Sequence, residues 1–162
     1  ISLLQMETLV SSQVTKVLPS IKTICVLGGS KLVASSQNID IVSQLVRELG
    51  KQKINLLYGG TSLTFFGSLL LAGKGFDIEV KSVLPFHKTP SKVLKDSTSL
   101  MLSNSIYDCT MLMVNHSDAF IILPGGYETL MTMFTIASWA DMKLHNKPIG
   151  LLNSHHIFNG FI

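Results

Sequence analysis

Short apolar runs that end in glycine alternate along this chain with stretches of helical periodicity. Thr23–Leu27 and Ile54–Tyr58 have the composition of buried strands, and they run directly into Gly28 and Gly59. Between them, apolar residues recur every three to four positions over Ile39–Lys51, which predicts an amphipathic helix. Strand, turn and helix repeated in this order favour an α/β fold: a doubly wound parallel sheet with helices on both faces.

The same alternation continues to the end of the chain. It predicts further strands over Glu79–Leu84, Ala119–Leu123 and Pro148–Leu152. Helices are expected over Ser62–Ala72, over Tyr107–Asn115, and from just after Gly126 to near Met142. The pattern assigns no type to the short apolar stretch Ser99–Leu102.

Length and composition predict one domain. The 162 residues are 46% hydrophobic and 14% charged, which is enough apolar material for a large core. We expect this domain to span residues 21–162 and to lack its natural C-terminus, because the chain stops within an apolar pattern. Residues 1–20 are expected to form an N-terminal extension, either an amphipathic helix or the remnant of a targeting peptide. A cytoplasmic location is expected, or an organellar one if the extension is a transit-peptide remnant.

Charge and motif content argue against several kinds of partner. The formal net charge is +3, but the lysines are scattered without a basic stripe, so nucleic acid is not an expected partner. No apolar run reaches the roughly 18 residues that a membrane-spanning helix needs. Cys25 and Cys109 match no metal-ligand spacing, and adjacent side chains such as His155 and His156 point to opposite faces of a strand. We therefore expect no metal and no cofactor.

Three of the expected strand-to-helix turns are rich in glycine. They are Gly28-Gly29-Ser30, Gly59-Gly60-Thr61-Ser62 and Pro124-Gly125-Gly126. In parallel sheets ligands bind beyond the carboxyl ends of the strands, where glycine lets the backbone approach and helix amides favour an anion. These turns predict a phosphate-bearing ligand, with plain tight turns as the alternative. None of them matches a Walker loop or the GxGxxG fingerprint.

The stretch Ser117–Thr129 (SDAFIILPGGYET) resembles the LOG family of cytokinin riboside 5′-monophosphate phosphoribohydrolases, whose older members were often labelled lysine decarboxylases. That family carries a Pro-Gly-Gly-x-Gly-Thr-x-x-Glu motif. Further similarities are Gly29-Ser30, Tyr58-Gly59-Gly60, Ser62, Gly67, Trp139-Ala140 and Lys147–Asn153. The resemblance implies a Rossmann-like fold, a homodimer, and metal-free hydrolysis of the N-glycosidic bond of a nucleoside 5′-monophosphate to cytokinin base and ribose 5-phosphate.

The residues that this resemblance would make catalytic are replaced. The motif glutamate falls on Thr132, and the family's Arg-Lys pair falls on Cys109 and Thr110. Cleavage builds positive charge on the ribose, so the reaction needs a nearby carboxylate, and the 5′-phosphate needs cations. We therefore expect impaired activity. The alternatives are a catalytically inactive subunit or scaffold of a larger assembly, and a regulator that binds nucleotide without cleaving it.

Glu128 stands where the family motif has glycine. It has three interpretations: an acid that satisfies the helix dipole, a carboxylate that occupies the emptied phosphate site, or a relocated catalytic acid on the same helix face as Thr132. Beside a ligand phosphate about 5 Å away, its charge would cost roughly 3 kcal/mol at an effective dielectric of 20, more than a hundredfold in affinity.

The positions expected to act on the substrate can now be given together. The catalytic positions are Cys109 and Thr132. The positions expected to bind substrate and phosphate are Gly29, Ser30, Gly59, Gly60, Ser62, Thr110, Gly125, Gly126, Tyr127, Glu128, Thr129 and Ser138. The expected partners are a nucleoside 5′-monophosphate, if the protein is active, and a second copy of the chain or a larger complex.

Three other residues or pairs have a chemical interpretation that is weaker than a structural one. Phe65 and Phe66 could stack on a base, but core packing is favoured at the start of an apolar helix. Cys109 could act as a nucleophile with His116, which requires the helix between them to end early. Arg47, the sole arginine, is far from every glycine-rich turn and is expected on the surface.

Overall fold

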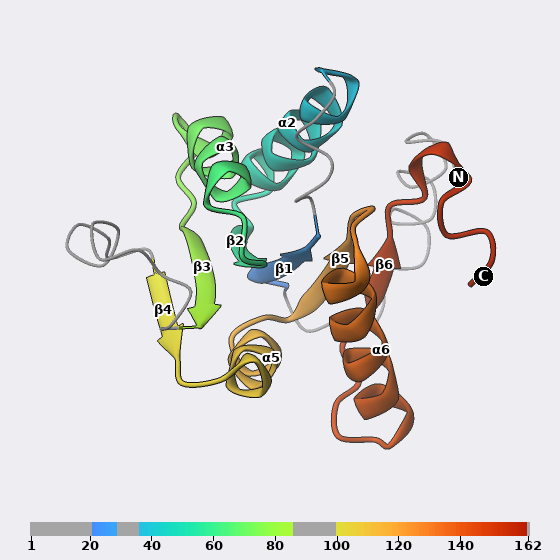
Figure 1. The fold of residues 1–162 in the computed structure, drawn as a ribbon. Coiled ribbons are helices and arrows are strands. Elements are labelled where there is room, and N and C mark those ends of the chain that lie inside the picture. The colour runs from blue at the N-terminus through green and yellow to red at the C-terminus, as the bar shows by residue number, and fades with distance from the viewer. Residues whose placement is uncertain (1–20, 29–35, 86–99, 162) are drawn as a thin grey trace.

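The computed structural model describes residues 21–28, 36–85 and 100–161 of the chain. The expected extension over residues 1–20 and the candidate site residues Gly29 and Ser30 lie outside the described residues. The strands form one six-stranded parallel sheet in the order β4-β3-β2-β1-β5-β6 (Figure 1). The strands are β1 (Thr23–Leu27), β2 (Asn55–Gly59), β3 (Val80–Pro85), β4 (Leu100–Ser103), β5 (Ala119–Ile122) and β6 (Ile149–Leu151).

In the described part of the chain, four α-helices cover the two faces of the sheet. They are α2 (Ser36–Lys51), α3 (Leu63–Gly73), α5 (Ile106–Asn115) and α6 (Tyr127–Asp141), and a 3-10 turn follows β6 at Ser154–His156. Helices α2 and α3 lie on one face, and α5 and α6 lie on the other (Figure 1). The expected doubly wound, Rossmann-like α/β fold is confirmed, and the unassigned Ser99–Leu102 stretch contributes the edge strand β4. Among the described helices, none combines the length and apolar character needed to cross a membrane.

The alternation of side chains along β1 separates the core into two layers. Ile24 and Val26 pack with Val46 of α2 and Leu69 of α3. Cys25 and Leu27 point to the opposite face and pack with residues of α5 and α6. Because consecutive strand residues point to opposite faces, an almost continuous apolar strand is what a sheet covered on both sides requires.

The chain reverses its direction of winding between β1 and β5. Strand β1 pairs with β2 on one side and with β5 on the other, and Leu27 is in register with both Gly59 and Ile122. The chain leaves β1 through α2 towards β2, and it leaves β5 through α6 towards β6. The turns after β1, β2 and β5 therefore meet at one edge of the sheet, which is where ligands bind in folds of this kind.

Two helix starts at this edge are stabilised by serine caps. Ser62 Oγ accepts a hydrogen bond from the Phe65 N–H at 3.2 Å, and Ser105 Oγ accepts one from the Asp108 N–H at 3.1 Å. Both serines have extended backbone angles, as N-cap residues do. The cap at Ser62 turns the chain from β2 into α3 directly after Gly59 and Gly60.

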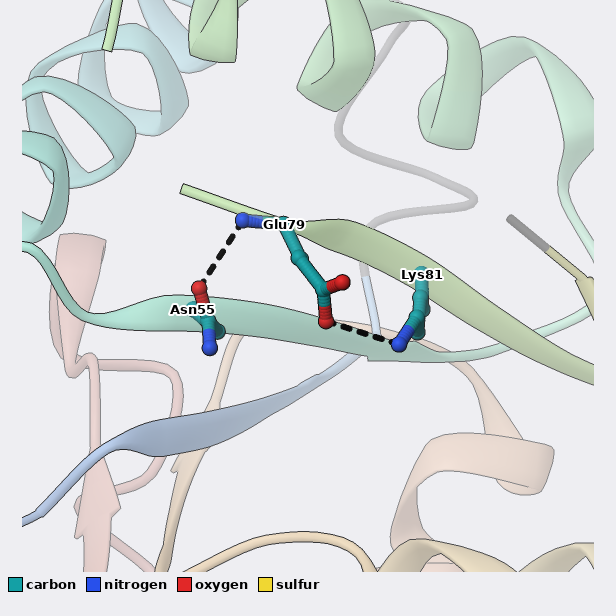
Figure 2. Close-up of polar contacts among 3 residues, drawn as sticks. All are labelled: Asn55, Glu79 and Lys81. Carbon is teal, nitrogen blue, oxygen red and sulfur yellow. Dashed lines mark hydrogen bonds and ion pairs between the residues drawn. The ribbon is translucent and has the colours of Figure 1, made fainter. Parts of the chain in front are cut away.

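The opposite edge of the sheet carries a polar cluster at the amino ends of β2 and β3 (Figure 2). Asn55 Oδ1 accepts a hydrogen bond from the Glu79 N–H at 2.8 Å, and Lys81 Nζ lies 2.7 Å from Glu79 Oε2. The ion pair is largely exposed, so it contributes at most about 1 kcal/mol. The hydrogen bond from the Glu79 N–H to Asn55 fixes how β3 enters the sheet beside β2. This cluster is structural.

Two expectations about side-chain placement are confirmed. Phe65 and Phe66 are buried and pack on the Tyr58 ring, with centroid distances of 5.3 and 6.2 Å. They belong to the core beneath α3 and offer no ring to a base. Arg47 is exposed on α2, away from the edge where the glycine-rich turns meet.

Candidate functional site

A cavity of about 180 Å³ lies at the carboxyl ends of β1, β2 and β3, against the first turns of α5 and α6. We call it the switch-point cavity. Its floor includes Gly28, Gly59 and Gly60, and Glu128 lies where α6 begins. The topology therefore brings together turns that are about 30 and 65 residues apart in the sequence, as expected for a sheet of this winding.

The cavity gathers many of the positions that the sequence singled out. Its lining includes Gly59, Gly60, Cys109, Thr110, Gly126, Tyr127, Glu128, Thr129 and Thr132. Ser62, Gly125 and Ser138 are not part of this lining. Ser62 caps α3, and Ser138 is exposed roughly three helical turns beyond the start of α6.

Cys109 is held inside the protein by a hydrogen-bond relay. Ser103 Oγ donates to the Ser105 carbonyl at 2.8 Å, and the Cys109 Sγ lies 2.8 Å from the same hydroxyl oxygen. Since the hydroxyl proton is directed at Ser105, the thiol is the donor to Ser103. His116 lines a different cavity, at the amino ends of the strands. The hypothesis that Cys109 and His116 form a nucleophilic pair is therefore wrong, because α5 continues to Asn115 and separates them.

The two threonines at family motif positions use their hydroxyl protons within their own helices. Thr110 Oγ1 donates to the Ile106 carbonyl at 3.3 Å, and Thr132 Oγ1 donates to the Glu128 carbonyl at 3.0 Å. Both side chains are buried and neutral. Neither can supply the charge of an arginine–lysine pair or of a catalytic glutamate.

Glu128 joins two of the glycine-rich turns across the cavity. Its carboxylate accepts a hydrogen bond from Thr61 Oγ1 at 3.3 Å. Gly126 is the N-cap residue of α6 and offers no side chain to cap the helix. Glu128 is the acidic residue of the first turn, where its carboxylate interacts favourably with the helix dipole. Glu128 is exposed at the cavity rim, and water therefore reduces its repulsion of an anion below 3 kcal/mol, towards about 1 kcal/mol in bulk water.

Tyr58 ends in a buried hydroxyl beside the same rim. The residue is 1% exposed, and its Oη has no hydrogen-bond partner of normal geometry among the described residues, although the Ser62 N–H faces it. Burial raises the pKa of the phenol well above its ordinary range; the Ser62 N–H lowers it and the Glu128 charge raises it further. The hydroxyl is therefore a neutral hydrogen-bond donor at physiological pH.

The glycines of these turns are required by contacts within the protein. Gly28 has a φ of +101°, and a Cβ there would lie 2.6 Å from the Leu123 carbonyl oxygen. A Cβ at Gly60 would lie 2.3 Å from Tyr58 Oη, and one at Gly125 would lie 2.1 Å from Thr129 Oγ1. Close packing thus explains why glycine occupies these positions, and the argument for a ligand depends on the cavity itself.

The apolar wall of the cavity was missed by reasoning from the sequence. Val83, Pro85, Ile106 and Met113 contribute apolar side chains to its lining. In the sequence these residues have the pattern of ordinary core positions. The only signal in the sequence was that Met113 keeps its position when the chain is aligned with the family motif. That position lies on the side of α5 that covers the ends of the strands.

The open parallel sheet, with its change of winding between β1 and β5, places the protein in the Rossmann-like α/β class, in which ligands bind at the switch point. Within the described ranges, no group of three or more His, Cys, Asp or Glu side chains is placed to hold a metal ion. Comparison with known proteins identifies the family within this class. Residues 72–162 match the family model described as "Possible lysine decarboxylase".

Curated relatives cover most of the chain. Cytokinin riboside 5′-monophosphate phosphoribohydrolase LOG1 of Arabidopsis thaliana is 32% identical over 142 residues, which are 87% of this chain and 67% of the relative. Probable cytokinin riboside 5′-monophosphate phosphoribohydrolase LOG6 of Arabidopsis thaliana is 34% identical over 133 residues, 82% of this chain and 66% of the relative. The probable enzyme LOG4 of Oryza sativa subsp. japonica is 30% identical over 143 residues, 88% of this chain and 62% of the relative. The chain belongs to the LOG family, and it spans about two thirds of the length of these relatives.

Proposed function

We propose that this protein is a LOG-family member that accepts a nucleoside 5′-monophosphate as a phosphoribohydrolase with strongly impaired turnover. The observation that carries the proposal is the state of the two catalytic positions. Cys109 and Thr132 line the switch-point cavity, where a thiol and a hydroxyl stand in place of the family's arginine and glutamate, and each makes a hydrogen bond within the protein.

The size of the impairment follows from the chemistry. Hydrolysis of an N-glycosidic bond passes through a ribose with positive charge, and a carboxylate that stabilises this charge and positions water contributes about 10²- to 10⁴-fold in rate. Within the described lining, Glu128 is the only Asp, Glu, Lys, Arg or His residue. It lies one helical turn before Thr132, and its carboxylate accepts a hydrogen bond from Thr61. A displacement of roughly 5 Å is too large for a group that must act on C1′.

The test is hydrolysis of isopentenyladenosine 5′-monophosphate, with release of free base followed by chromatography. The unmodified chain is expected to be at least 10²-fold slower than a Cys109→Arg, Thr132→Glu, Glu128→Gly triple variant. Cys109 is buried, so a Thr132→Glu, Glu128→Gly double variant is measured as well, in case arginine prevents folding. The proposal fails if the unmodified chain cleaves as fast as a folded variant.

A second candidate is a catalytically inactive subunit, and an exposed apolar surface on α6 favours it. Met131 and Phe134 of this helix are exposed by 44% and 50%, and Tyr127, at the mouth of the cavity, is exposed by 91%. The Phe134 ring packs edge-on against Phe161, with centroids 5.6 Å apart. Large exposed side chains in one region are typical of a surface that another protein covers.

The two candidates differ in what happens when this surface is made polar. For the inactive subunit, a Met131→Glu, Phe134→Glu variant loses self-association in light scattering coupled to chromatography, and the triple variant described above gains no activity. Retained association of the surface variant, together with restored turnover in the triple variant, contradicts this second candidate. A homodimer predicts a twofold mass for the unmodified chain.

A further inference from the structure

The charge on the described lining of the switch-point cavity is opposite to what a phosphate ligand requires. Among the described residues that line it, Glu128 is the only one that carries a charge at neutral pH. The first turn of α6, whose start would otherwise attract an anion, carries this carboxylate, which also accepts a hydrogen bond from Thr61. Within the described part of the cavity, a 5′-phosphate therefore meets one negative charge and no cation.

The hydroxyl of Tyr58 is a second and independent feature at the same rim. It is buried, the Ser62 N–H faces its oxygen, no acceptor for its own proton is found among the described residues, and it lies against the backbone of Gly60, which lines the cavity. A buried hydroxyl without a partner destabilises the free protein. A hydroxyl group of a ligand at this rim would give Tyr58 an acceptor and give Glu128 a donor.

We propose that the switch-point cavity selects an unphosphorylated nucleoside over its 5′-monophosphate, with Glu128 as the residue that determines this specificity. A carboxylate that accepts hydrogen bonds from ribose hydroxyls is a common way to hold a nucleoside sugar. Leu27, Val83 and Met113 supply an apolar wall for the base. The inference rests on the proposed function for the nucleoside part of the ligand. It differs in expecting the ligand that binds most tightly to lack the 5′-phosphate.

The experiment is calorimetric titration of the full chain with a cytokinin riboside and, separately, with its 5′-monophosphate. The riboside is expected to bind between about fivefold and a hundredfold more tightly, because the Glu128 charge repels the phosphate and solvent exposure weakens that repulsion. Glu128→Gln is expected to abolish this preference, and Glu128→Gly to reverse it. Glu79→Gln, at the opposite edge of the sheet, is the matched control and is expected to keep the preference.

Tyr58→Phe separates a binding role from a structural one. The variant removes only the hydroxyl and keeps the ring packing, so we expect riboside binding to weaken about tenfold while the thermal midpoint stays equal or rises. Weaker binding with a lower midpoint, or unchanged binding, contradicts a role in the ligand site.

Three outcomes overturn the inference: equal affinity for the two ligands, tighter binding of the monophosphate, or no binding of either. The proposed function fails on a different readout, since it is contradicted by rapid release of free base. A riboside preference together with rapid hydrolysis would refute only the proposed impairment, and slow hydrolysis with a monophosphate preference would refute only this inference.

Discussion

Thr23 and Asp118 exchange hydrogen bonds between the starts of β1 and β5, although 95 residues separate them. The Asp118 N–H donates to the Thr23 carbonyl at 2.8 Å, and the Thr23 N–H donates to Asp118 Oδ2 at 2.9 Å. The same carboxylate oxygen accepts the Lys22 N–H at 2.8 Å. The aspartate of the Ser-Asp-Ala-Phe stretch therefore aligns two central strands from their amino ends, far from the switch-point cavity.

Replacing this carboxylate should destabilise the sheet without touching the cavity. For Asp118→Ala we expect the free energy of unfolding to fall by about 1–3 kcal/mol, because two backbone N–H groups lose a charged acceptor. Urea unfolding followed by circular dichroism measures the change. Asp141→Ala, in the exposed last turn of α6, is the control and should change the value by no more than about 0.5 kcal/mol. Equal effects of the two variants would refute the role of Asp118.

Lys147 stabilises the end of α5 from a distant part of the chain. Its Nζ donates to the Val114 carbonyl and, at 2.6 Å, to the Ser117 carbonyl. A cation at the carboxyl end of a helix also interacts favourably with the helix dipole. We expect Lys147→Met to lower the free energy of unfolding by about 1.5–3 kcal/mol. The control is the exposed Lys74→Met, and a loss no larger than that of the control contradicts the prediction.

Most of the sheet could be predicted from the sequence, because each central strand is a β-branched or leucine-rich run that ends in a turn residue. Strand β4 could not. Its four residues, Leu100–Ser103, show no alternation, and only pairing with β3 makes them a strand. Helix α2 begins at Ser36, before the expected Ile39, since the apolar period that predicts a helix starts only at Ile39 in the sequence.

The candidate site was predictable where its residues are glycines or motif positions. It was not predictable where they are apolar, since Val83 and Met113 have the same pattern whether they face a core or a cavity. Only the crossing of α5 over the ends of β2 and β3 distinguishes the two, and that depends on tertiary packing. The bond between Thr61 and Glu128 was likewise invisible, because 67 residues separate the partners.

Two helical glycines should respond to alanine in opposite directions. A Cβ at Gly67, inside α3, would meet no heavy atom of the described residues within 4 Å beyond its own helix turn, so Gly67→Ala should raise the free energy of unfolding by about 0.5–1 kcal/mol through helix propensity. A Cβ at Gly50 in α2 would lie 2.4 Å from the Phe76 ring, and Gly50→Ala should lower it by about 1–3 kcal/mol. Thermal unfolding compares them: a gain of stability in both variants would show that the Phe76 contact is relieved at little cost, and a loss in both would contradict the prediction for Gly67.

The buried thiol of Cys25 predicts a loss of stability in alkali. Burial raises the pKa of this thiol far above its ordinary value of 9.0. Above pH 9 the unfolded chain loses the thiol proton while the folded chain keeps it, so the unfolded state binds fewer protons and the free energy of unfolding falls as pH rises. Each pH unit above that point costs about 1.4 kcal/mol.

The Cys25→Ala variant isolates this contribution, because every other titrating group is common to both proteins. Urea unfolding of both, under reducing conditions between pH 7.5 and 10, should give parallel curves up to about pH 8.5. Above that pH the unmodified chain should lose stability relative to the variant, approaching about 1.4 kcal/mol per unit. Tyr58, whose phenol has its pKa raised by the same cause, adds a further loss above its ordinary value of 10.0 in both proteins. Curves that stay parallel to pH 10 would mean that the Cys25 thiol ionises as readily in the folded protein as in the unfolded chain.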